Sequence, residues 1–128
     1  MMYNKLVKTC FFDIRQGGSI EELSSEQCVI KHFSEKAGQS MEISLACSKV
    51  GVIECARFRA QGGPFVIAGL EYLCRQLEGS ALEKHPCFSY QEFIALFEIP
   101  DNLFPQALRI EDLYSDAIKK MKEAIKED

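Results

Sequence analysis

Cysteine and histidine are the residue types in this chain best suited to bind a metal or to act as nucleophiles. The chain has six cysteines, at positions 10, 28, 47, 55, 74 and 87, and two histidines. No two cysteines have the C-x-x-C spacing of zinc sites and redox-active dithiols. Cysteines within apolar segments usually pack as small hydrophobic side chains, and we expect this of Cys10, Cys28 and Cys74.

Two pairs of the remaining cysteines and histidines are close enough in the predicted structure or in the sequence to be considered as metal ligands. Cys47 and Cys55 lie on facing strands of a predicted hairpin, and one residue separates His85 from Cys87. Neither grouping supplies four converging soft ligands by its spacing. We therefore expect no bound metal. The alternative is a metal or cluster carrier with relocated ligands. It requires at least three residues of one set to converge in space: Cys47, Cys55, Cys74, Cys87, His32 and His85.

Motifs for other chemistry are missing from the sequence. It contains no G-x-S-x-G nucleophile elbow, no Walker phosphate loop and no H-E-x-x-H zinc helix. The glycine pairs at 17–18 and 62–63 are explained more simply as turns than as phosphate cradles. We predict that the protein is not an enzyme.

Length and charge limit the remaining classes. The chain of 128 residues is long enough for one domain with a single core, 47% of its residues are apolar, and its net charge is −4. This charge does not favour nucleic acid, and the lysines at 119, 120, 122 and 126 are interpreted as a solvated helix end that complements the helix dipole. No apolar run approaches the roughly 20 residues of a membrane span. The N-terminus also lacks signal-peptide features, so we expect a cytoplasmic protein.

Hydrophobic periodicity predicts the elements that must position these residues. A first helix follows Asn4, a plausible cap, and three strands are predicted at 27–34, 41–48 and 52–60. Further helices are predicted from Pro64 to Leu77, after the Ser89 capping box, and from about 110 to 126. This order predicts one α+β domain over 1–128, with a three-stranded antiparallel sheet packed against several helices.

Several short segments, in this order, resemble one known family. They are Asp13–Gly18 (DIRQGG), Ala56–Gly62 (ARFRAQG), Leu77–Gly79 (LEG) and Asp116–Ile118 (DAI). Their order and spacing resemble the IscU family of iron–sulfur cluster scaffolds, also known as the NifU N-terminal domain. The resemblance covers nearly the whole chain and implies the same fold.

The resemblance implies a cluster site whose ligands this chain lacks. The family assembles a [2Fe–2S] cluster on three cysteines, assisted by an aspartate, because iron in such clusters needs thiolate ligands. The corresponding positions here hold Ala37, Gln39, Gly63 and Ile110, and a histidine used by some members corresponds to Arg109. Guanidinium has no lone pair to offer a metal. We therefore expect no cofactor at this site.

The resemblance also implies a partner-binding segment that is partly lost. Before the third cysteine, the family has an L-P-P-V-K peptide that docks a specialised heat-shock chaperone. The corresponding stretch here is Leu103, Phe104 and Pro105, followed by Gln106 and Ala107. An exposed, extended Leu-Phe-Pro segment would bind a partner at low entropic cost, and a loop that plugs its own core is the equal alternative.

These inferences predict a degenerate scaffold-like protein that acts as a non-enzymatic interaction or accessory module. The resemblance implies that its partners are a cysteine desulfurase or other proteins of iron–sulfur cluster assembly. A weaker alternative is a small anionic ligand in the vacated pocket. Ala37, Gly63 and Ile110 would line that pocket, and Arg109 would pair with the anion.

Overall fold

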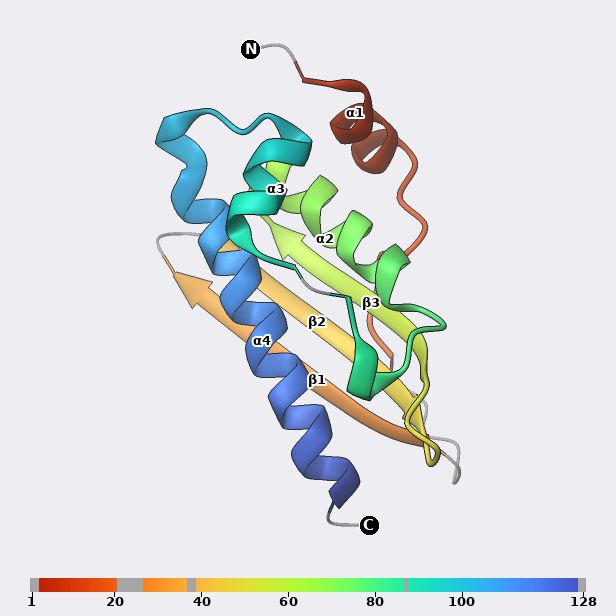
Figure 1. Ribbon diagram of the computed structural model, residues 1–128. Coiled ribbons are helices and arrows are strands. Elements are labelled where there is room, and N and C mark those ends of the chain that lie inside the picture. The colour runs from red at the N-terminus through yellow and green to blue at the C-terminus, as the bar shows by residue number, and fades with distance from the viewer. Residues whose placement is uncertain (1–2, 21–26, 37–38, 87, 127–128) are drawn as a thin grey trace.

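The computed structural model describes residues 3–20, 27–36, 39–86 and 88–126 (Figure 1). In chain order its elements are α1 (Lys5–Phe12), β1 (Gln27–Lys36), β2 (Gln39–Ser48), β3 (Ile53–Gln61), α2 (Pro64–Leu77), η1 (Leu82–Lys84), α3 (Tyr90–Phe97), η2 (Asp101–Leu103) and α4 (Phe104–Lys126). The predicted α+β class and three-stranded antiparallel sheet are confirmed.

The sheet has the order β1-β2-β3, and both strand pairs are antiparallel. Strand β2 is central. Its side chains at 41, 43, 45 and 47 are all buried, as the alternating sequence predicts for a face turned toward a core. Because β2 is hydrogen-bonded on both edges, the sheet is a firm platform for the helices above it.

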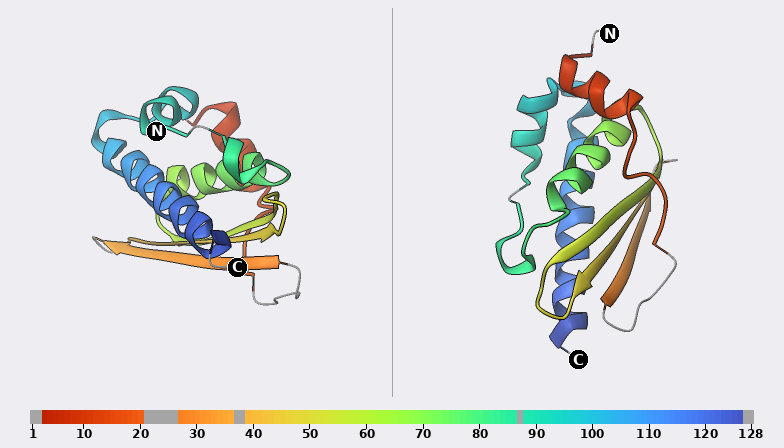
Figure 2. Two further views of the ribbon diagram at one scale, coloured as in Figure 1. Left: turned by 60° about the horizontal axis from the view of Figure 1, so that its bottom comes forward. Right: turned by 90° about the vertical axis from the view of Figure 1, so that its right-hand side faces the viewer.

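The helices lie on one face of the sheet (Figure 2). Helix α4 packs on β1 and β2, α2 packs on β3, and α1 and α3 form an outer layer on α2 and α4. The core lies between these layers, and its largest fully buried side chains include Phe65, Phe93, Phe97, Met41 and Leu45. No helix within the described residues is long and apolar enough to cross a membrane.

Helix ends follow the caps that the sequence predicts. The Asn4 side chain accepts a hydrogen bond from the Val7 N–H over 2.9 Å, and the Ser89 hydroxyl accepts one from the Glu92 N–H over 3.1 Å. These bonds satisfy N–H groups that have no partner inside the first turn. Gly79 follows α2 with a φ of 89°, a left-handed conformation that suits glycine.

The start of α4 differs from the prediction of about residue 110. The helix begins at Phe104, directly after the short helix η2. Pro105 therefore lies in the first turn, where its missing N–H is not needed and its fixed φ already matches a helix. As a result, the Leu-Phe-Pro segment is helical rather than extended, and Arg109 lies inside the helix rather than before its start.

The segment between α1 and β1 joins opposite edges of the sheet. Gly17 forms a parallel bridge with Phe58 on the outer edge of β3, and the Gly18 N–H donates to the Phe58 carbonyl over 2.8 Å. The chain then continues to β1, at the far edge. The Ser19 and Ser44 hydroxyl oxygens lie 3.3 Å apart, and Ser44 is fully buried although its neighbours in β2 face the helices. The first part of this segment is therefore attached to the sheet.

Candidate functional site

Arg109 and Gln39, two of the predicted site residues, are in direct contact. The Arg109 Nη1 donates to Gln39 Oε1 over 2.8 Å and to the Lys36 carbonyl over 3.1 Å, and Nη2 lies 3.4 Å from the Gln39 carbonyl oxygen. The arginine thus connects α4 to the end of the β1–β2 hairpin. A guanidinium is protonated at any physiological pH, so this position holds a permanent positive charge.

The other predicted site positions have different environments. Gly63 precedes α2 in an extended conformation, and a Cβ placed there meets no atom within 4 Å. Ile110 is fully buried in the core. The sequence suggested that Ile110 lines an apolar pocket open to a ligand. Its burial in the core does not agree with that role. Ala37 lies outside the described residues.

A surface hollow of about 380 Å³ lies beside Arg109. It is lined by Lys36, Gln39, Asn102, Pro105, Gln106, Leu108, Arg109 and Asp112. The lining carries charges of both signs, and it also includes the apolar side chains of Pro105 and Leu108. Apolar groups next to charged and polar ones are typical of protein interfaces.

The predicted partner-binding residues lie at the same end of the molecule. Leu103 packs partly against the core, Phe104 is 36% exposed, and Pro105 is exposed. Leu108, one turn after Phe104, is 43% exposed. Phe104 and Leu108 therefore form an apolar pair at i, i+4 spacing on α4. Sequence reasoning missed this pair because it assigned the segment an extended conformation.

The thiols do not assemble a metal site. Cys47 faces the helices opposite Ile53, whereas Cys55 pairs with Ala46 and so lies on the other face of the sheet. His85 bonds through Nδ1 to the Tyr114 hydroxyl at 2.6 Å, and Cys87 lies outside the described residues. Among the residues that the structure does describe, no three histidine, cysteine, aspartate or glutamate side chains are placed to hold a metal ion.

The environment of the thiols also suppresses their ionisation. Cys10 and Cys74 are buried as predicted, whereas Cys28 is half-buried and packs against the core opposite Cys47. Burial is the main cause that raises the pKa of Cys10 and Cys74, and it raises the pKa of Cys47 to about 11. A protonated thiol is a poor ligand and a poor nucleophile.

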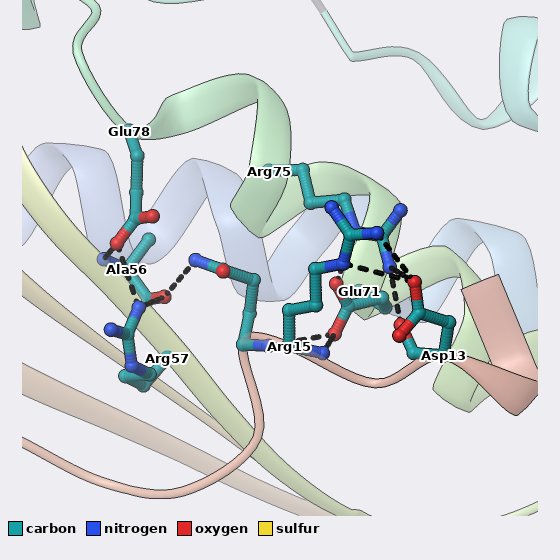
Figure 3. Close-up of polar contacts among 8 residues, drawn as sticks. Asp13, Arg15, Ala56, Arg57, Glu71, Arg75 and Glu78 are labelled. Atoms are coloured by element: carbon teal, nitrogen blue, oxygen red, sulfur yellow. Dashed lines mark hydrogen bonds and ion pairs between the residues drawn. The ribbon is translucent and has the colours of Figure 1, made fainter.

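A buried carboxylate network that the sequence analysis missed fixes the turn after α1 (Figure 3). Glu71 of α2 is fully buried, and its Oε1 accepts from the backbone N–H of Arg15 over 3.0 Å and of Gln16 over 2.9 Å. Its Oε2 forms an ion pair with Arg75, which also contacts Asp13. The turn at 13–16 lies within the Asp13–Gly18 stretch that resembles the family, and Glu71 holds this turn in place.

A second carboxylate, at the C-cap residue Glu78 directly after α2, binds β3. Glu78 Oε2 accepts from the Ala56 N–H over 3.0 Å and from Arg57 Nη1 over 2.7 Å. The Gln16 side chain donates to the Ala56 carbonyl over 3.0 Å, so both networks meet at this strand. Partial burial alone would raise the pKa of Glu78. Hydrogen bonds from Ala56, Gln16 and Arg57 outweigh that effect and lower it.

Comparison with known proteins identifies this arrangement. A family model described as the NifU-like N terminal domain matches residues 2–128, nearly the whole chain. The chain belongs to this family, whose members generally act as scaffolds for iron–sulfur clusters. A solved structure with the same fold is that of a nitrogen-fixing NifU-like protein (N-terminal) from Brucella abortus. It shares 13% identity, with 94% of each chain covered and a TM-score of 0.66. No curated protein matches the chain.

The residues described at the family's cluster positions do not fit an iron–sulfur cluster. Of the positions that the resemblance assigns to the cluster site, Gln39, Gly63 and Ile110 offer no thiolate, and Arg109 places a fixed positive charge beside Gln39. Iron–sulfur clusters require soft, anionic sulfur ligands, and a fixed cation nearby opposes iron binding electrostatically.

Proposed function

We propose that this protein is an accessory or interaction module of iron–sulfur cluster assembly that has kept the scaffold fold without assembling a cluster. The observation that carries the proposal is the bond between Arg109 and Gln39. Two positions that correspond to the family's site residues bind each other, so the site is closed by the chain's own side chains. The core that positions these residues is nevertheless intact.

Retention of the fold favours a role in binding. The face beside Arg109 presents the apolar pair Phe104 and Leu108 next to the hollow with Lys36 and Asp112 on its wall. Apolar anchors surrounded by a polar rim are typical of protein interfaces. The partner class that fits the proposal is a cysteine desulfurase or another protein of the assembly machinery, with this chain as an accessory or competitor of a true scaffold.

Anaerobic reconstitution with iron and sulfide tests the loss of cluster assembly. The purified protein is expected to retain almost no iron and to show a featureless visible spectrum. A thiol-containing scaffold of the same family, treated in parallel, supplies the positive control. A stoichiometric brown species on the wild-type chain would contradict the proposal and would favour the relocated-ligand carrier.

Binding to a desulfurase tests the partner. We expect saturable binding at micromolar concentration, weakened in a Phe104→Ala/Leu108→Ala variant. Val50 is 87% exposed in the β2–β3 turn, so Val50→Ala is the matched control for the loss of an exposed apolar side chain. If the desulfurase does not bind at this concentration, that partner is excluded while the loss of cluster assembly still stands on the spectrum.

The structure gives less support to a small anionic ligand at Arg109. The guanidinium already donates to Gln39 and to the Lys36 carbonyl, and Ile110 is buried in the core. An anion would have to displace these bonds before it could pair with the arginine.

A further inference from the structure

A second hollow, of about 440 Å³, lies beside the C-terminal half of α4. Its lining residues are His85, Ser115, Ile118, Lys119, Lys122, Glu123 and Lys126. From Arg109 to Lys119 the helix advances roughly 15 Å at its usual rise per residue. The hollow is therefore distinct from the surface beside Arg109, and its lining comes from both α4 and the loop after η1.

The charge of this hollow is opposite to that of the whole chain. Lys119, Lys122 and Lys126 recur at intervals of three and four residues, so they share one face of α4. They line the hollow with a single carboxylate, Glu123, whereas the chain carries a net charge of −4. Within the described part of the chain, no carboxylate lies at ion-pair distance from these ammonium groups.

The helix dipole alone does not explain this arrangement. The partial negative charge of a helix C-terminus acts mainly within the last turn, and Lys119 lies nearly two turns before the end of α4 at Lys126. The neighbouring Lys120, by contrast, points away from the hollow and donates to the Lys31 carbonyl over 3.1 Å. Lysines on this helix thus have different environments: Lys119, Lys122 and Lys126 line the hollow, whereas Lys120 does not.

His85 is held in a defined orientation at the wall of the hollow. His85 Nδ1 lies 2.6 Å from the Tyr114 hydroxyl and 3.2 Å from the Pro86 carbonyl, and the Tyr114 hydroxyl donates to the same carbonyl over 2.7 Å. These contacts with Tyr114 and Pro86 fix the orientation of the imidazole ring.

We propose that this hollow binds a small ligand that carries at least two linked phosphate groups. Several ammonium groups on one helix face match several phosphate charges, and lysine is a common phosphate-binding residue. Ser115 and His85 also line the hollow and are able to add hydrogen bonds that a purely electrostatic patch would lack. The volume lies within the range of small-molecule sites. This proposal does not depend on the function proposed above.

Titration of the full chain with inorganic pyrophosphate, followed by calorimetry and by amide NMR shifts, tests the proposal. We expect saturable binding, with shifts centred on His85 and on residues 115–126. The Lys119→Gln/Lys122→Gln/Lys126→Gln variant should bind at least roughly tenfold more weakly, because each charge-assisted hydrogen bond typically contributes that much. Stronger competition by ATP would assign a nucleotide, and weaker competition an inorganic polyphosphate.

The matched control removes the same charge from other surfaces. Lys5, Lys49 and Lys120 are exposed and lie outside the hollow, so their triple glutamine variant should keep the affinity of the wild type. A His85→Gln variant should bind severalfold more weakly. The proposal is overturned if pyrophosphate shows no saturable binding at millimolar concentration or if both triple variants lose affinity equally. It is also overturned if only long polyanions such as heparin bind.

Discussion

The Arg109 guanidinium lies 2.8 Å from the side-chain oxygen of Gln39 and joins the second turn of α4 to the first residue of β2. The resemblance to scaffolds of this family implies that these two positions correspond to residues of the cluster site. Here the Arg109 side chain extends from α4 to the β1–β2 hairpin and donates hydrogen bonds to Gln39 and to the Lys36 carbonyl. The contact gives both residues a structural role.

Removal of the Arg109 side chain should cost stability without restoring metal binding. Arg109→Ala loses hydrogen bonds to Gln39 and to the Lys36 carbonyl, so we expect the free energy of unfolding to fall by about 1–2 kcal/mol. Urea denaturation measures this change, and iron analysis after reconstitution should stay near zero. Substantial iron in the variant would mean that the arginine alone had excluded the metal.

Glu71 should be the most sensitive polar position of the core. Glu71→Ala leaves Arg75 without its partner and removes the acceptor for the Arg15 and Gln16 N–H groups, so we expect a loss of about 3–5 kcal/mol. Thermal or urea unfolding reports the loss. Glu83→Ala, at an exposed position of η1, is the control and should change stability by less than about 0.5 kcal/mol. Equal effects would refute the anchoring role.

Glu78 should make stability depend on acid pH. Its pKa in the folded protein is lowered from the ordinary value of 4.5, so its contribution is complete above that value. As the pH falls below 4.5, the unfolded chain takes up the proton first. The contribution is then lost as the pH falls through the lower folded-state pKa. The stability difference between the wild type and Glu78→Gln should therefore shrink between pH 5 and pH 3. A constant difference would show that the carboxylate charge plays no part.

Gly69 should not tolerate even one added methyl group. A Cβ at this position of α2 would lie 2.2 Å from Phe93 Cζ and 3.0 Å from Ile110 Cδ1. Such overpacking usually costs about 1–3 kcal/mol, despite the better helix propensity of alanine. Gly63→Ala is the matched control because a Cβ there meets no atom within 4 Å, and its cost should stay below about 1 kcal/mol. A neutral Gly69→Ala variant would mean that Phe93 can move away freely.

The regular elements were predictable because they depend on local pattern. The alternation of Met41, Ile43 and Leu45, and the caps Asn4 and Ser89, involve residues close in sequence, and the structure confirms them. The start of α4 was predicted wrongly because Pro105 can either stiffen an extended segment or open a helix, and only tertiary packing decides.

The polar networks were less accessible from sequence. Glu71 lies between Leu70 and Tyr72 on a helix that is otherwise largely apolar, a signal that could have marked it as a buried acid. Its partners, however, are backbone groups at positions 15 and 16, and no residue type reveals such a bond. Arg109 and Gln39 are likewise 70 positions apart. Contacts over such separations follow from the fold and cannot be read from either segment alone.

The attachment of the N-terminal turn to Glu71 also bears on how the chain is made. Arg15 leaves the ribosome 56 residues before the carboxylate that binds its N–H. At ordinary rates of translation the turn must wait roughly 3 to 11 seconds for its partner. The β1–β2–β3 meander, whose contacts are local, has time to form during that interval. Closure of the N-terminal segment against α2 and β3 is therefore expected to be a late step of folding during synthesis.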